Sequence, residues 1–154
     1  MVEKCFIYTS KRYRQTKLVS EVENNRLCNM YRFFKVDFSF ELYLTELDFS
    51  NRLILSKLRC GNLKLPNNLR RFNVVDIDRN CKLCGIDMLG DEFHYLFICK
   101  FFADDRSKYI NPHILRHQNI SLKMSELFNS KNIMVLNDLC KFAKVLSSKI
   151  TFNI

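Results

Sequence analysis

Residues 79–100 read RNCKLCGIDMLGDEFHYLFICK and contain four side chains that can bind a metal. Cys81 and Cys84 form a Cys-x-x-Cys pair, and His94 and Cys99 follow further along the same stretch. Three thiolates and one imidazole are a ligand set that binds zinc in a closed, tetrahedral, structural site. We therefore predict that this stretch is a CCHC zinc knuckle that binds one structural Zn²⁺ through these four residues.

The local sequence suggests how the ligands are presented. Gly85 and Gly90 bracket a turn or small hairpin after the cysteine pair, and Asp91 is an N-cap for a helix over residues 92–100. That helix carries the other two ligands. Five positions along an ideal helix differ by about 140° in direction. The helix must therefore end or loosen near Cys99 if both ligands are to face one ion.

Three other interpretations of these residues remain open. The thiols could be core residues without a metal, since a free cysteine packs as a small apolar group. A redox Cys-x-x-Cys is disfavoured because no βαβ pattern precedes it. The pair His113-x-x-x-His117 has the spacing of helix-borne ligands, but it is distant in sequence from the thiols and fits helix packing.

Composition favours a mainly α fold. The chain has 154 residues, of which 47% are hydrophobic, and only three are glycine and two proline. So few turn formers favour helices over a many-stranded sandwich. We expect a small helical domain over residues 31–154, with the knuckle embedded in it, and a basic helical arm over residues 1–30. Helices are expected at residues 11–27, 41–47, 49–60, 92–100, 104–109, 121–128 and 132–150.

Two boundaries and one strand are predicted from particular residues. Asp48 is a natural N-cap for the helix that follows it, and Gly61 is a natural C-terminal stop. Val74, Val75 and Ile77 favour a short strand.

The charge of the chain favours nucleic acid as a partner. Lys and Arg number 25 against 16 Asp and Glu, a net charge of +9, and residues 4–20 and 49–75 contain basic side chains and no acid. Such a field attracts phosphate backbones, although a solvated basic face is the simpler alternative. The side chains that we expect to bind nucleic acid are Arg59, Lys64, Arg70, Arg71, Arg79 and Lys82.

Targeting and membrane signals are not found in the sequence. The segment Phe6-Ile7-Tyr8 is too short for an export signal, and no apolar run has membrane-spanning length. Apart from the knuckle, the cysteines have no meaningful spacing. We expect a reducing, nuclear or cytoplasmic location and no membrane partner.

One short motif suggests catalysis. Phe102-Ala103-Asp104-Asp105 matches the paired aspartates that hold Mg²⁺ in reverse transcriptases. That site needs flanking strands and a further aspartate, whereas these carboxylates follow a metal-binding cysteine and fit the first turn of a helix. We therefore regard the match as coincidental and expect no enzymatic activity.

From Tyr31 to about Ile150, the sequence resembles the C-terminal zinc-binding region of reverse transcriptases from non-LTR (LINE-like) retrotransposons. The most specific match is Asp91-Glu92-Phe93-His94-Tyr95-Leu96-Phe97-Ile98-Cys99. The other landmarks arrive in order: Tyr31-Arg32-Phe33-Phe34-Lys35, Glu41-Leu42-Tyr43-Leu44, Leu55-Ser56-Lys57-Leu58-Arg59, Arg79-Asn80-Cys81-Lys82-Leu83-Cys84 and Arg106.

The resemblance implies an accessory segment that handles nucleic acid during reverse transcription, here free-standing and without the polymerase or endonuclease. The metal-binding role maps onto the four knuckle residues. This chain departs from the family at residues 65–71, where an acidic residue and a Gly-Arg are common.

Two functions follow from these features. The first is a non-catalytic, zinc-stabilised module that binds RNA or DNA, mainly through phosphates. The alternative is a structural or protein-interaction remnant of a retroelement polyprotein, without nucleic-acid binding of its own. Its apolar helices, at residues 49–58 and 133–150, would then dock on a separately encoded polymerase. Scattered arginines and an exposed apolar patch would favour the alternative.

Overall fold

The computed structural model describes part of the 154-residue chain. The described backbone comprises residues 2–24, 30–35, 39–72 and 78–150, and side chains are described within these ranges except for residues 2–9 and 70–72. This backbone is mainly helical, as predicted, and its only β-pairing is an isolated antiparallel bridge between Asn80 and Leu89.

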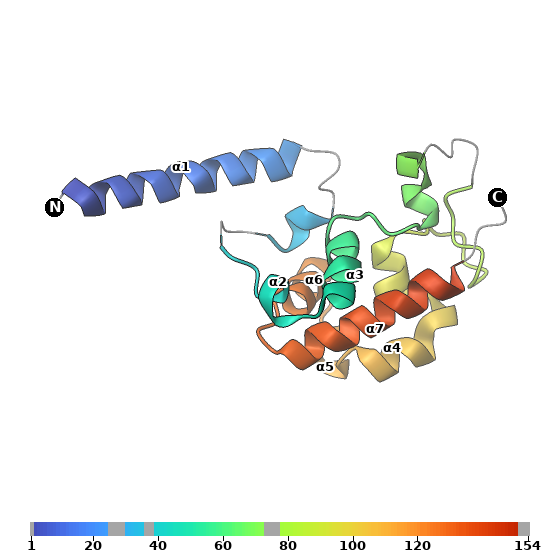
Figure 1. Ribbon diagram of the computed structural model, residues 1–154. Coiled ribbons are helices and arrows are strands. Elements are labelled where there is room, and N and C mark those ends of the chain that lie inside the picture. Colours follow the sequence, from blue (N-terminus) through green and yellow to red (C-terminus); the bar gives the residue numbers. More distant parts are fainter. Residues whose placement is uncertain (1, 25–29, 36–38, 73–77, 151–154) are drawn as a thin grey trace.

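Most of the helices follow one another with short connections, and many of them pack into one body (Figure 1). In chain order they are α1 (Val2–Asn24), η2 (Tyr31–Phe33), α2 (Tyr43–Glu46), α3 (Phe49–Arg59), η3 (Pro66–Phe72), η4 (His94–Ile98), η5 (Lys100–Phe102), α4 (Ala103–Tyr109), α5 (Pro112–Arg116), α6 (Ile120–Phe128) and α7 (Ile133–Lys149). Among these, η4 is a π-helical turn.

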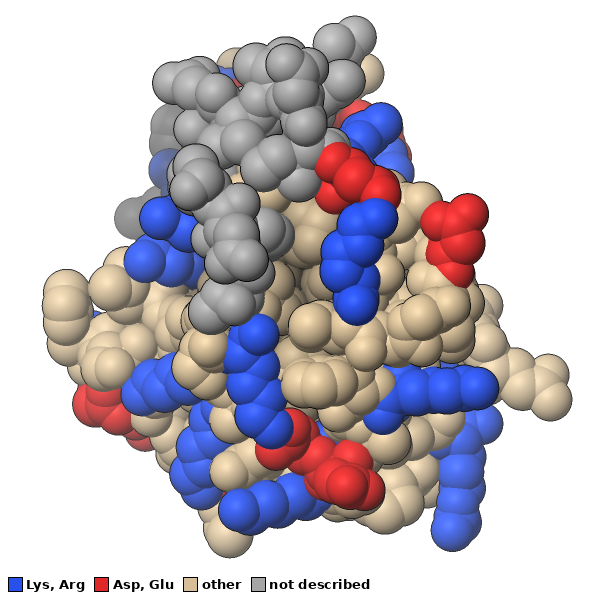
Figure 2. Space-filling view, turned by 90° about the vertical axis from the view of Figure 1, so that its right-hand side faces the viewer, with Lys and Arg blue, Asp and Glu red and all other residues tan. Residues whose placement is uncertain are grey.

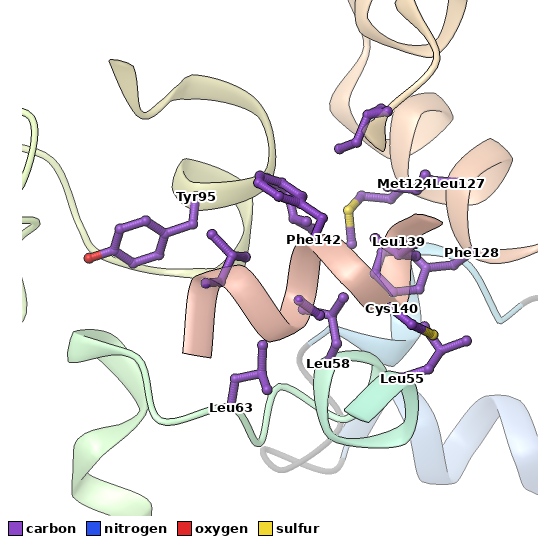
Figure 3. Close-up of a cluster of buried hydrophobic side chains, with 14 of the residues drawn as sticks. Leu55, Leu58, Leu63, Tyr95, Met124, Leu127, Phe128, Leu139, Cys140 and Phe142 are labelled. Carbon is purple, nitrogen blue, oxygen red and sulfur yellow. The ribbon is translucent and has the colours of Figure 1, made fainter. Parts of the chain in front are cut away.

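The core is built around α7, which packs against α2, α3, α4 and α6. Its apolar face is buried, with Leu139, Cys140, Phe142 and Leu146 fully enclosed. Figure 3 shows side chains of α3, α6 and α7 meeting in this cluster. Burial of each large apolar side chain contributes about 1.5–3 kcal/mol, so the C-terminal helix is central to stability.

The helix boundaries follow the local sequence signals. The Asp48 carboxylate accepts the Asn51 N–H at 2.9 Å at the start of α3, and Gly61 adopts a positive φ of 60° after its end. The side chain of Asn132 caps α7 in the same way, accepting the Met134 N–H at 2.9 Å. The predicted cap and stop of α3 are therefore confirmed.

The first helix extends to one side of the body in Figure 1. It begins at Val2, earlier than the predicted Lys11, and its described side chains are mostly exposed, with Val22 buried near its end. The predicted end of this helix at Leu27 and the predicted strand over residues 74–77 lie outside the described residues.

Candidate metal centre and basic surface

The four predicted ligands converge on one point. The Sγ atom of Cys81 lies 3.7 Å from that of Cys84 and 3.9 Å from that of Cys99, and the Cys84 Sγ lies 3.4 Å from Nε2 of His94. All four donor atoms lie within 4.8 Å of one another. The thiols are free rather than disulfide-bonded. The cluster could therefore hold a metal ion.

These separations can be compared with the edges of a coordination tetrahedron. Bonds of about 2.3 Å to sulfur and about 2.0–2.1 Å to nitrogen give edges of about 3.8 Å between two sulfurs and about 3.5 Å between sulfur and nitrogen. The observed separations of 3.7, 3.9 and 3.4 Å match these edges to within about 0.1 Å. The residues therefore fit an ion of this size and ligand preference.

A π-helical turn brings the last two predicted ligands, His94 and Cys99, onto one face of the helix. The N–H of Cys99 donates to the carbonyl oxygen of His94 at 2.7 Å, a hydrogen bond that spans five residues. Such a turn is wider than an α-helical one, so residues five apart come to lie on the same face. Cys99 then leaves the helix with an extended ψ of 119°. The predicted loosening of the helix at Cys99 is thus present.

A tight turn presents the first two ligands. The N–H of Cys81 donates to the Met88 carbonyl at 2.8 Å, and the N–H of Leu83 points at the Cys81 Sγ at 3.4 Å. Gly85 follows with φ 67°, a left-handed conformation that glycine adopts without strain. The expected small hairpin is present as a turn closed by one bridge.

Asp91 begins the helical segment that carries His94. Its carboxylate oxygen Oδ1 accepts the backbone N–H of His94 at 2.9 Å, as expected of an N-cap. Burial raises the pKa of Asp91, although the hydrogen bonds that it accepts and nearby His94 oppose this effect. The cap thus fixes the start of the ligand-bearing turn.

The electrostatics of the centre favour a bound cation. Burial opposes ionisation of Cys81, but hydrogen bonds from the Leu83 N–H and the Tyr95 hydroxyl outweigh it and lower the pKa of Cys81. Burial, with the charge of Cys81 beside it, raises the pKa of Cys99 to about 12. Three thiolates this close repel one another, so a cation is needed to keep all of them ionised.

The imidazole is in the form that binds metals. Burial lowers the pKa of His94, so the ring is neutral at pH 7. Its Nε2 faces the thiols, while Nδ1 is buried and has no hydrogen-bond partner among the described residues. Nε2 is therefore the atom that faces the other donors and would bind an ion, with the proton of the neutral ring on Nδ1.

A buried arginine that the sequence analysis treated only as a family landmark supports the centre from behind. The Arg106 Nε donates to the carbonyl oxygen of Leu96 at 2.8 Å, and its Nη2 donates to those of Cys99 at 2.7 Å and Tyr95 at 3.3 Å. These carbonyls lie within the π-helical turn and directly after it. The positive charge of Arg106 would also offset the excess negative charge of three thiolates around a bound divalent ion.

The structure corrects the prediction for Arg59. This side chain is 2% exposed, its Nη2 pairs with the Glu41 Oε2 at 2.5 Å, and its Nη1 donates to the Phe128 carbonyl at 2.7 Å. The guanidinium also lies over the rings of Tyr31, Phe34, Tyr43 and Phe128. Because it is enclosed by one carboxylate and four rings, it cannot reach a phosphate.

The other residues predicted to bind nucleic acid either are exposed, unlike Arg59, or have side chains outside the described residues. Lys64, Arg79 and Lys82 are exposed, and Lys82 pairs with Asp78. Arg70 and Arg71 lie in η3, but their side chains fall outside the described residues. Figure 2 shows Lys and Arg spread over one face of the molecule, with Asp and Glu between several of them. Among the described residues of that face, Figure 2 shows no continuous basic patch.

The remaining motifs occupy ordinary helical positions. Asp104 and Asp105 lie in the first turn of α4, as expected, and Asp105 pairs with Lys149 at 2.7 Å. His113 and His117 lie in and just after α5, as a group separate from the thiols, and both face Glu126 of α6. No sequence pattern marks Glu126, because its partners are set by the packing of two helices.

No family model, curated protein or solved structure matches the chain. Within the described ranges, no helix is both long and apolar enough to cross a bilayer.

Proposed function

We propose that the protein is a non-catalytic, zinc-stabilised module that binds RNA or DNA mainly through phosphates. The observation that carries the proposal is the convergence of Cys81, Cys84, His94 and Cys99 at the edge lengths of a zinc tetrahedron. The resemblance to the C-terminal zinc-binding region of non-LTR retrotransposon reverse transcriptases supplies the nucleic-acid role.

The proposed zinc ion has a structural role. Four protein ligands complete its coordination and leave no position for substrate or activated water. Three of these ligands, Cys81, His94 and Cys99, are buried, so the ion would be shielded from solvent. The number of ions bound by each purified chain, measured by native mass spectrometry, tests this step. An unchanged number of bound ions after Cys84→Ser together with His94→Ala would contradict it.

The exposed face of α1 carries four basic side chains close together in the sequence. Lys11, Arg12, Arg14 and Lys17 are all exposed, and Lys17 forms only a long 3.8 Å contact with Glu21. A surface pair of this kind contributes little and leaves the field positive. Because α1 extends to the side of the body (Figure 1), a phosphate backbone can approach it without displacing other elements.

Salt-dependent binding tests the nucleic-acid role. We expect labelled single-stranded and duplex RNA and DNA to bind with an affinity that falls steeply with salt concentration. Replacing Lys11, Arg12 and Arg14 by Gln should reduce the salt slope by up to about 2–3, since each lost phosphate contact removes about 0.7–0.9. The matched control removes three exposed lysines of the body, Lys108, Lys131 and Lys141. Undetectable binding at low salt, or binding indifferent to salt, would refute the role.

A second candidate, docking to a separately encoded polymerase, is favoured by one observation. On α3, Phe49 is 73% exposed and Leu53, one turn later, is 47% exposed. By contrast, the apolar face of α7 packs into the core and is not available for docking. Phe49→Ser with Leu53→Ser should leave nucleic-acid binding unchanged if the first proposal is correct. A loss of binding to a co-expressed polymerase in this variant would favour the second.

A further inference from the structure

A second group of metal-binding side chains lies between α5 and α6, in a part of the fold without thiols. It consists of His113, His117 and Glu126, which we call the α5–α6 cluster. One donor atom from each residue lies within 4.8 Å of the others. We infer that this cluster is a second, solvent-accessible site for a divalent first-row transition metal ion, independent of the zinc knuckle.

The helix starts fix the positions of these side chains. The side chain of Asn111 caps α5 by accepting the His113 N–H at 2.9 Å, and that of Asn119 caps α6 by accepting the Ser121 N–H at 2.7 Å. Buried residues hold both helices to the body, Ile114 from α5 and the group Met124, Leu127 and Phe128 from α6. The cluster therefore lies on the outward side of two anchored helices.

The three side chains already point at one another. Oε1 of Glu126 lies 3.3 Å from Nδ1 of His113, and Oε2 lies 2.5 Å from Nε2 of His117. The two imidazole rings are 5.2 Å apart and nearly perpendicular. In the described part of the chain, Glu126 has no lysine or arginine partner within ion-pair distance. Its carboxylate is thus directed at two nitrogen donors.

The distances suit a small cation. Bonds of about 2.0–2.1 Å to nitrogen and oxygen give a tetrahedral edge of about 3.3 Å. The His113–Glu126 separation already has this value. His117 contacts the other carboxylate oxygen, so the exposed carboxylate would have to rotate to place a single oxygen at this distance from both nitrogens.

The ligand chemistry selects the class of ion. Two imidazoles and one carboxylate suit Zn²⁺, Ni²⁺ or Cu²⁺, whereas Ca²⁺ and Mg²⁺ prefer oxygen ligands alone. Three protein ligands leave at least one position for water. His113 and Glu126 are also well exposed, at 70% and 42% of their side chains. We therefore expect this site to exchange its ion readily and to bind it less tightly than the knuckle.

The three histidines of the chain allow a direct test by imidazole NMR. The full-length protein is first given one equivalent of Zn²⁺ and then titrated with more. The inference predicts that the further Zn²⁺ shifts the His113 and His117 signals together, saturates at one equivalent and leaves the His94 signals unchanged. Shifts confined to His94, or none up to about 1 mM Zn²⁺, would overturn it.

Two variants and a control make the test specific. Glu126→Gln retains the size of the side chain and should weaken the second binding event at least about 10-fold. His113→Asn with His117→Asn should abolish that event and spare the first. Glu46→Gln, at an exposed glutamate on α2, is the matched control. Unchanged affinity in Glu126→Gln, with a melting curve like that of the wild type, would also overturn the inference.

Discussion

At the residue scale, Arg106 connects the metal centre to the helical body. Replacing it by Lys keeps the charge but cannot reproduce three hydrogen bonds to the carbonyls of Tyr95, Leu96 and Cys99. We expect Arg106→Lys to lower the free energy of unfolding by about 3 kcal/mol, since bonds to charged groups are worth about 1.5–3 kcal/mol each. Urea denaturation of the metal-loaded protein measures this.

A metal-affinity measurement distinguishes positioning from mere packing. If Arg106 holds the π-helical turn in place, Arg106→Lys should also weaken metal binding about 10-fold in competition with a chelator. Arg116→Lys, at an exposed arginine of α5, is the control. Lost stability with unchanged metal affinity would show that Arg106 only packs.

The buried thiol of Cys140 should make the protein less stable at alkaline pH. Its thiol is fully buried, donates to the Asn51 carbonyl and has its pKa raised by burial from 9.0 to about 12. Because the folded protein holds the Cys140 thiol neutral, its burial stabilises the protein fully below pH 9. This stabilisation is lost as the pH rises towards 12, since the thiol then ionises more readily in the unfolded chain. By pH 10 the native state should lose about 1.4 kcal/mol from this group alone.

The matching variant is Cys140→Ala, which removes the titrating group. Its free energy of unfolding should fall less between pH 8 and pH 10 than that of the wild type, as measured by urea denaturation at each pH. Equal pH slopes in the two proteins would contradict the prediction.

Single residues differ in how well sequence reveals them. Cys81, Cys84, His94 and Cys99 were predictable because a metal site demands particular side chains at short spacing. Arg59 was predicted to be exposed because charge alone indicates a surface. Its partners, Glu41 and four aromatic rings from three other segments, exist only once the helices have packed.

At the element scale, Gly90 marks a close contact between η3 and the knuckle. A Cβ atom there would lie 2.8 Å from the Pro66 Cγ and 3.0 Å from the Tyr95 hydroxyl. Gly90→Ala should therefore destabilise the protein by about 1–3 kcal/mol through overpacking. Displacing Tyr95 should also weaken metal binding, because its hydroxyl bonds to Cys81.

The control for this prediction is Gly85→Asn. Gly85 has a positive φ of 67°, but a Cβ there meets nothing within 4 Å, and asparagine tolerates this conformation. Thermal melting and metal titration of both variants compare them directly. If Gly90→Ala lowers the melting temperature and the metal affinity less than Gly85→Asn does, the contact between η3 and the knuckle is loose.

Element boundaries were predictable where a single residue marks the end of a helix. Asp48 caps the start of α3 through a local hydrogen bond, and Gly61 follows its end with a positive φ, so neither boundary needs a tertiary partner. The π-helical turn was predictable only as a geometric requirement, since no residue type specifies it. It brings His94 and Cys99 onto one face, and Arg106 from α4 donates hydrogen bonds to carbonyls within and directly after it.

At the scale of the whole molecule, removal of the metal should loosen the protein. The ligands lie against the core, since Cys81 and Cys99 belong to the same buried cluster as Leu96 and Phe102. We expect a strong chelator to lower the melting temperature by at least about 10 °C, because metal-binding energy contributes directly to folding. Differential scanning fluorimetry measures the shift.

Cys84→Ser is the companion variant for metal removal. It should melt at the lower temperature already and respond little to chelator, since its site is incomplete. An unchanged melting temperature of the wild type in chelator would refute the structural role of the metal.

The order of the helices along the chain has a consequence for biosynthesis. All four knuckle ligands lie within residues 81–99, whereas α7, the centre of the core, is made only from Ile133 onward. During translation these four residues therefore leave the ribosome before α7, and the nascent chain can capture the proposed ion. The C-terminal helix would then complete the core around a segment that is already ordered.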